Sequence, residues 1–194
     1  MLDRNLYLIK EHARILKLVD RYDIFDPKTG EQIGIVKDEP SSVLKYLRLF
    51  MKKRSLPTTV NVYENEDAAP VFSIRKHMPI IRSKVQVIDG NGMPIGYFKS
   101  KILTIGGGFN VFDMQDNKIA DIKGDWKGWN FKFLDPSGAE IGTVTKKWAG
   151  IGKELFTTAD TYMISIDETK SDHKTNMMLL AAGLAIDIVF KERR

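Results

Sequence analysis

The residues best suited to ligand chemistry are five basic side chains that lie close together in the sequence. No Asp or Glu occurs between Ser41 and Leu56, a segment that contains Lys45, Arg48, Lys52, Lys53 and Arg54. The chain has 30 basic and 25 acidic residues, so subtracting these five leaves 25 of each sign, and the rest of the chain is neutral. Concentrated positive charge attracts polyanions. We therefore expect these five side chains to bind an anionic phospholipid or another acidic ligand.

The spacing of apolar residues predicts a short amphipathic helix near residues 41–54. The segment follows a proline, begins with a serine that can cap a helix, and has apolar side chains at helical spacing at Val43, Leu44, Leu47, Phe50 and Met51. Two arrangements are open. The helix can lie on an anionic bilayer, where each Lys or Arg adds roughly 1 kcal/mol. It can instead dock its apolar stripe on the protein and leave the basic side chains in solvent, which is the commoner arrangement in globular proteins.

Four aspartates recur in one sequence context and could be mistaken for a metal-binding set. They are Asp26, Asp89, Asp113 and Asp135. A small residue follows each of them seven or eight positions later, and these residues are, in the same order, Gly34, Gly96, Ala120 and Gly142. Period-two alternation flanks a turn in every copy, and an Asp in a turn can bind its own downstream backbone. We predict four hairpins whose aspartates serve the turn and whose small residues mark a bend or a close backbone approach. A fifth, degenerate hairpin is predicted over residues 60–76.

Five hairpins, one strand near residues 5–9 and one near residues 158–166 give about twelve strands. The carboxy-terminal segment 175–190 is almost entirely apolar, too short to cross a bilayer, and has to be hidden from water. A barrel of this size is wide enough to enclose a helix. We predict a mainly β fold, one domain over residues 1–194, in which a closed antiparallel barrel of repeated hairpins surrounds a central, buried, hydrophobic carboxy-terminal α-helix. An amphiphilic tail anchor is the competing interpretation of residues 175–190.

Other chemistry is sparse. The absence of Cys excludes disulfides, thiol catalysis and Cys-ligated zinc. His12, His77 and His173 lie far apart in the sequence, and no pair of nucleophile and base can be named, so we expect no enzyme, no catalytic residue, no metal and no cofactor. Three tryptophans near lysines could stack on bases, lie at a lipid interface or anchor the core at a barrel rim: Trp126, Trp129 and Trp148.

The hairpins and the carboxy-terminal segment resemble the phospholipid scramblase and LURP-one-related proteins, which share their fold with the carboxy-terminal domain of Tubby. The most specific part is FTTADTYMISID followed by NMMLLAAGLAIDIVFKE. The matching positions are Ala159, Asp160, Tyr162, Ile186, Asp187 and Phe190. The resemblance implies a twelve-stranded barrel around a buried helix and a scramblase-like protein.

The predicted function is that of a non-enzymatic barrel that binds anionic phospholipid or another acidic ligand at its surface. The alternative is a nucleic-acid-binding or regulatory protein-interaction module, which the same basic charge would serve. The first twenty residues interleave charged and apolar side chains and lack the apolar core of a signal peptide. We therefore expect a cytoplasmic protein that is peripheral at the membrane when it binds lipid. The sequence leaves the ligand and the oligomeric state open.

Overall fold

The computed structural model describes residues 1–12, 20–51, 55–78, 84–101, 107–125, 128–146 and 161–190. The strands are β1 (Leu6–Glu11), β2 (Arg21–Phe25), β3 (Gln32–Asp38), β4 (Thr58–Tyr63), β5 (Phe72–Lys76), β6 (Lys84–Asp89), β7 (Pro94–Ser100), β8 (Gly108–Phe112), β9 (Lys118–Asp125), β10 (Asn130–Leu134), β11 (Glu140–Thr145) and β12 (Thr161–Ile166). The helices are α1 (Ser42–Phe50), the short 3-10 helix η3 (Glu168–Lys170) and α2 (His173–Phe190).

The twelve strands form one closed antiparallel barrel. Each strand pairs with its neighbours in the chain, and β12 pairs with β1 to close the ring. Period-two alternation decides which side chains face inward: Tyr7 and Ile9 of β1 and Tyr22 of β2, for example, join the core. The prediction of a closed barrel of about twelve strands built from hairpins is confirmed, and the fifth hairpin is β4–β5.

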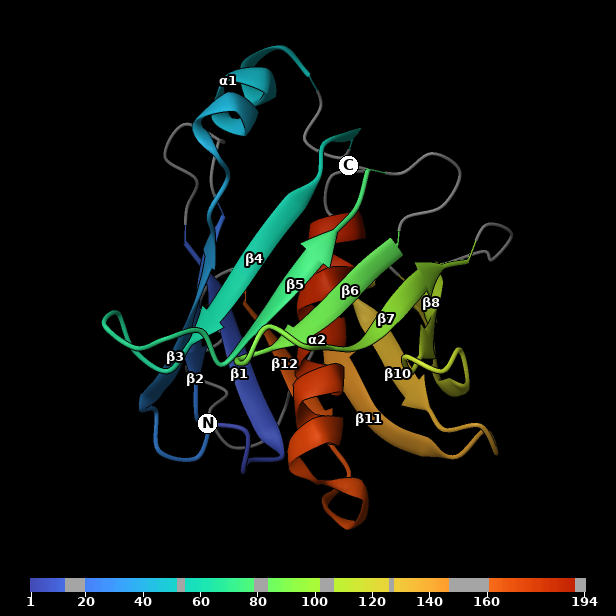
Figure 1. Ribbon diagram of the computed structural model, residues 1–194. Coiled ribbons are helices and arrows are strands. Elements are labelled where there is room, and N and C mark those ends of the chain that lie inside the picture. Colours follow the sequence, from blue (N-terminus) through green and yellow to red (C-terminus); the bar gives the residue numbers. More distant parts are fainter. Residues whose placement is uncertain are drawn as a thin grey trace.

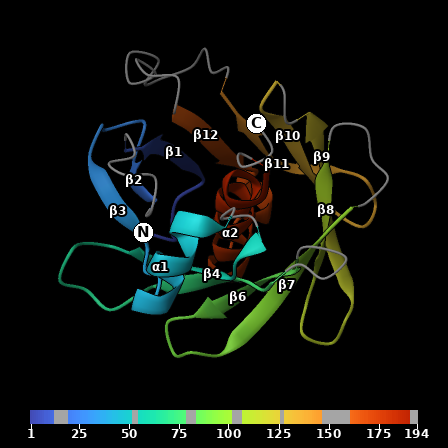
Figure 2. The ribbon, with the colours of Figure 1, turned by 90° about the horizontal axis from the view of Figure 1, so that it is seen from above.

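Helix α2 runs through the middle of the barrel, where the strands surround it (Figures 1 and 2). Side chains from Met177 to Ile188 are buried on every face of the helix, including the small residues that keep it thin. Gly183 lies so close to β12 that an added Cβ would stand 2.4 Å from Cδ1 of Ile164. The predicted buried central helix is confirmed, and the interpretation of this segment as a tail anchor is wrong because the barrel itself covers the apolar surface.

Polar contacts hold α2 near each of its ends. Near the helix start, the Asn176 amide donates to the backbone oxygens of Leu2 (2.9 Å) and Arg4 (3.0 Å). Near the helix end, the Tyr22 hydroxyl donates to Asp187 Oδ2 at 2.5 Å inside the core. Among the described helices, none is long and apolar enough to span a membrane.

The four repeated aspartates lie at one end of the barrel, which we call the turn end. Each carboxylate accepts backbone N–H groups of its own turn, as in the bonds from Ser137 (2.8 Å) and Ala139 (3.0 Å) to Asp135 Oδ1. Asp89 and Asp113 accept two backbone N–H groups in the same way, and Asp26 accepts that of Lys28. The prediction of turn chemistry is confirmed.

The small residue of each repeat stands beside a β-bulge. In each hairpin the small residue pairs with a residue of the preceding strand, and the strand register shifts directly after that paired residue. The small residues are Gly34, Gly96, Ala120 and Gly142. A Cβ at Gly96 would lie 2.6 Å from the Phe112 carbonyl oxygen, and one at Gly142 would lie 2.5 Å from the Ser165 carbonyl oxygen. The predicted close backbone approach is therefore confirmed at both glycines.

The opposite end of the barrel, which we call the α1 end, carries α1 between β3 and β4 (Figure 1). Most of the buried polar and charged residues among those described lie at the α1 end, at the ends of strands or next to them. Asp26 and Asn176 lie instead at the turn end. The α1-end set is Glu11, Asp20, Asp38, Arg48, Thr58, Lys76, Ser100, Thr161 and Asp187. Polar groups excluded from water need partners, so this end depends on specific pairing as well as on apolar packing.

Candidate functional site

Helix α1 begins and ends with ordinary capping signals. Ser41 Oγ accepts the backbone N–H of Leu44 at 3.4 Å, and the residue after Phe50 leaves the helix with extended backbone dihedrals. The predicted amphipathic helix near residues 41–54 is therefore present as a nine-residue helix that ends at Phe50. Residues 52–54 lie outside the described part of the chain.

Arg48 fixes α1 to the barrel. Its guanidinium donates from Nη1 to Asp38 Oδ2 at 2.6 Å and from Nη2 to Asp38 Oδ1 at 3.1 Å. The side chains of Arg48 and Asp38 are 1% and 0% exposed. A bidentate pair of this kind has a fixed geometry, and Asp38 is the last residue of β3. Arg48 therefore acts as an anchor whose charge is already compensated, although the sequence suggested a solvated ligand-binding side chain.

The opposite side of α1 is apolar and faces outward. Val43, Tyr46, Leu49 and Phe50 are 60% to 74% exposed, whereas Leu44 and Leu47 are half-buried. Of the two arrangements left open by the sequence, docking of the apolar stripe on the protein therefore applies to Leu44 and Leu47 and not to Val43, Phe50 and Met51. The reason is helical geometry. Once Arg48 points at Asp38, the residues on the far side of the same short helix must point away from the barrel.

Lys45 is exposed at the edge of this apolar side. We call the set Val43, Lys45, Tyr46, Leu49 and Phe50 the outward arc of α1. The predicted ligand-binding residues therefore divide into three groups. Lys45 is exposed, Arg48 is buried, and Lys52, Lys53 and Arg54 lie outside the described residues.

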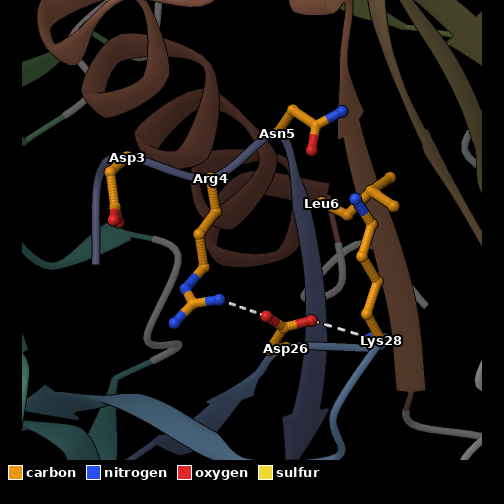
Figure 3. Close-up of a pocket in the computed structure, with 6 residues that line it drawn as sticks. All are labelled: Asp3, Arg4, Asn5, Leu6, Asp26 and Lys28. Atoms are coloured by element: carbon orange, nitrogen blue, oxygen red, sulfur yellow. Dashed lines mark hydrogen bonds and ion pairs between the residues drawn. The ribbon is translucent and has the colours of Figure 1, made fainter.

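A second candidate site is a recess of about 260 Å³ at the turn end, lined by residues of the amino-terminal segment and of the first turn (Figure 3). Arg4 points into it and forms an ion pair with Asp26. The carboxylate of Asp26 also accepts the backbone N–H of Lys28 at 2.7 Å. Because Arg4 is matched by a buried carboxylate, this recess ties the amino-terminal segment to the turn and presents little uncompensated charge to a ligand.

The other residues singled out in the sequence have mainly structural surroundings. Trp129 is buried against Phe131 and Tyr162, with Lys146 Nζ 4.7 Å from its ring centre, so it anchors the core at the α1 end. Trp126 and Trp148 lie outside the described residues. Within the described ranges, no group of three or more His, Asp or Glu side chains could hold a metal ion.

Two polar contacts were not visible in the sequence. His12 Nε2 lies 2.6 Å from Asp23 Oδ2, a pairing that only the alignment of β1 with β2 creates. Inside the barrel, burial and the neighbouring Asp187 carboxylate raise the pKa of Tyr22 and of Tyr162 well above the usual tyrosine value. Both tyrosines therefore stay neutral, and Tyr22 is a hydrogen-bond donor to the central helix.

Comparison with known proteins assigns the chain to a family through one match. Searches of curated proteins and of solved structures gave no match. The Scramblase family model matches residues 17–193, which include eleven of the twelve strands and both main helices. With the match extending over nearly the whole chain, this twelve-stranded barrel belongs to the Scramblase family.

Proposed function

We propose that this chain is a non-enzymatic, scramblase-like protein that binds anionic phospholipid surfaces through α1. The observation that carries the proposal is the outward arc, which puts exposed apolar side chains next to an exposed lysine on a helix outside the barrel. Amphipathic helices with basic residues beside an apolar side bind at the interface of anionic membranes. The family match supports a phospholipid as the ligand.

The charges that would attract the lipid are Lys45 and the three basic residues that follow the helix in the sequence, Lys52, Lys53 and Arg54. Each basic residue near an anionic surface contributes roughly 1 kcal/mol at moderate ionic strength. Arg48 is left out of this set because Asp38 already neutralises it. No acid lies between Ser41 and Leu56 to oppose the attraction.

Vesicle co-sedimentation tests the proposal. The protein should bind vesicles of phosphatidylcholine with phosphatidylserine more strongly than vesicles of phosphatidylcholine alone. The variant K45Q/K52Q/K53Q should lose most of that preference. Its control, K28Q/K170Q/K174Q, removes the same charge from exposed positions at the turn end and should bind like the parent protein. Equal binding to both kinds of vesicle, or none to either, would contradict the proposal.

The same preparation tests the nucleic-acid alternative. Binding to duplex DNA or to single-stranded RNA should be weak and should not compete with anionic vesicles. A nanomolar affinity with a steep dependence on salt, the signature of multiple phosphate contacts, would favour the alternative instead.

A further inference from the structure

We infer that α1 binds the membrane by insertion, with its outward arc entering the boundary between lipid headgroups and acyl chains. This inference rests on the proposed function and adds the mode of contact. It makes the apolar side chains of α1, in addition to its basic ones, determinants of lipid binding. It also fixes the orientation of the protein, with the α1 end of the barrel toward the bilayer.

The first support is the apolar surface itself. Val43, Tyr46 and Phe50 are spaced three and four residues apart, so they lie on one side of the helix. The rings of Tyr46 and Phe50 are 5.3 Å apart between centroids, and Leu49 lies beside them in the sequence, also exposed. Isolated exposed apolar residues are ordinary, but a contiguous group marks a contact surface. An aromatic residue with a polar tip, such as Tyr46, suits the membrane interface.

The second support is charge, which identifies the occupant of this surface. Lys45 borders the apolar side chains, and the sequence from Ser41 to Leu56 has no acid. A second copy of the chain packed with its outward arc against this one would bring like charges together. An anionic bilayer instead offers phosphates to Lys45 and an apolar interior to Phe50, so it complements both parts of the arc.

The third support is that the orientation of the outward arc is already fixed in the protein without a membrane. Arg48 and Asp38 are both buried and joined by two hydrogen bonds, so the helix has a defined rotation about its axis. Turning Val43 and Phe50 inward would break this pair. Arg48 is accordingly a positioning residue for membrane contact.

The first test removes apolar surface without changing charge. The variant L49S/F50S should lower partitioning to phosphatidylserine-containing vesicles at least about tenfold, since each buried large side chain is worth a comparable factor. Both residues are exposed, so the variant should keep the melting temperature of the parent protein. The matched control M93S/M114S removes two exposed apolar side chains at the turn end and should bind like the parent.

The second test reads insertion directly. The chain has no Cys, so a single F50C substitution takes an environment-sensitive fluorophore at one position. The label at residue 50 should shift its emission to the blue on phosphatidylserine-containing vesicles and be quenched by nitroxide-labelled acyl chains. A label on M93C should show neither effect.

The outcomes separate the two proposals. Binding to anionic vesicles with no shift at residue 50, and with L49S/F50S unaffected, would overturn insertion while leaving lipid binding by charge alone. No binding to any vesicle would overturn both. If the parent protein is a dimer in solution and L49S/F50S is a monomer, a second copy covers the arc and insertion is overturned.

Discussion

The two ends of the barrel are built by different means. The turn end repeats one local solution four times, in which an aspartate closes a tight turn and a small residue sits beside a bulge. The α1 end has no repeated motif among the described residues, and it pairs charged side chains from separate elements, as in Arg48 of α1 and Asp38 of β3. Local repetition builds the barrel, whereas pairing between elements fixes the surface that we propose to bind lipid.

The sharpest test of this difference removes the anchor of α1. Arg48→Met leaves the Asp38 carboxylate buried without its main partner, and breaking a buried pair in this way costs about 3 to 5 kcal/mol. We expect urea unfolding to show a loss in that range. The double variant D38L/R48M should recover most of it, because an apolar pair of similar size replaces both charges. A loss of less than about 1 kcal/mol for R48M would mean that water readily takes the place of the guanidinium, and that the pair does not hold α1.

A smaller but still global effect is expected at the turn end. Gly142→Ala would place a methyl group 2.5 Å from the Ser165 carbonyl oxygen, and a backbone atom cannot move aside as a flexible side chain can. Overpacking of this kind costs about 1 to 3 kcal/mol. Thermal unfolding should show a lower midpoint with a single transition. The control is Gly138→Asn, where the backbone has φ of +90° and an added Cβ would meet nothing within 4 Å. Asn tolerates positive φ better than most residues do, so this substitution should cost less.

The two ends also differ in how far the sequence predicts them. The turn end follows from local spacing, because Asp135 and Gly142 act on neighbours a few residues away or on the adjacent strand. Burial of α2 follows from its composition, since a helix apolar on all faces has to be covered. The pairing of Arg48 with Asp38 is different. It depends on where β3 ends relative to α1, so a segment with five basic residues gives no sign of which one is buried.

The smallest expected effect is on how the stability of the turn end depends on pH. Hydrogen bonds from the Ser137 hydroxyl and from the backbone of its turn lower the pKa of Asp135 from its ordinary value of 3.8. Its contribution to stability is therefore fully present above about pH 4 and is lost as the pH falls through the lowered pKa. Asp135→Ala should destabilise the protein at neutral pH by less than Gly142→Ala does, and the difference from the parent should shrink in acid.

Asp135→Asn isolates the charge from the geometry, because the Asn side-chain oxygen can still accept the turn N–H groups while the side chain cannot titrate. Its unfolding free energy should consequently be less sensitive to pH than that of the parent below about pH 4. Denaturant unfolding at several pH values checks this. Parallel pH curves for the parent and D135N would assign the acid sensitivity to other carboxylates. The pKa of Asp113 and that of Asp167 are lowered in the same direction, so these are the next positions to replace. Asp113 accepts hydrogen bonds in the β8–β9 turn, whereas Asp167 accepts them from Thr169 as the N-cap of η3.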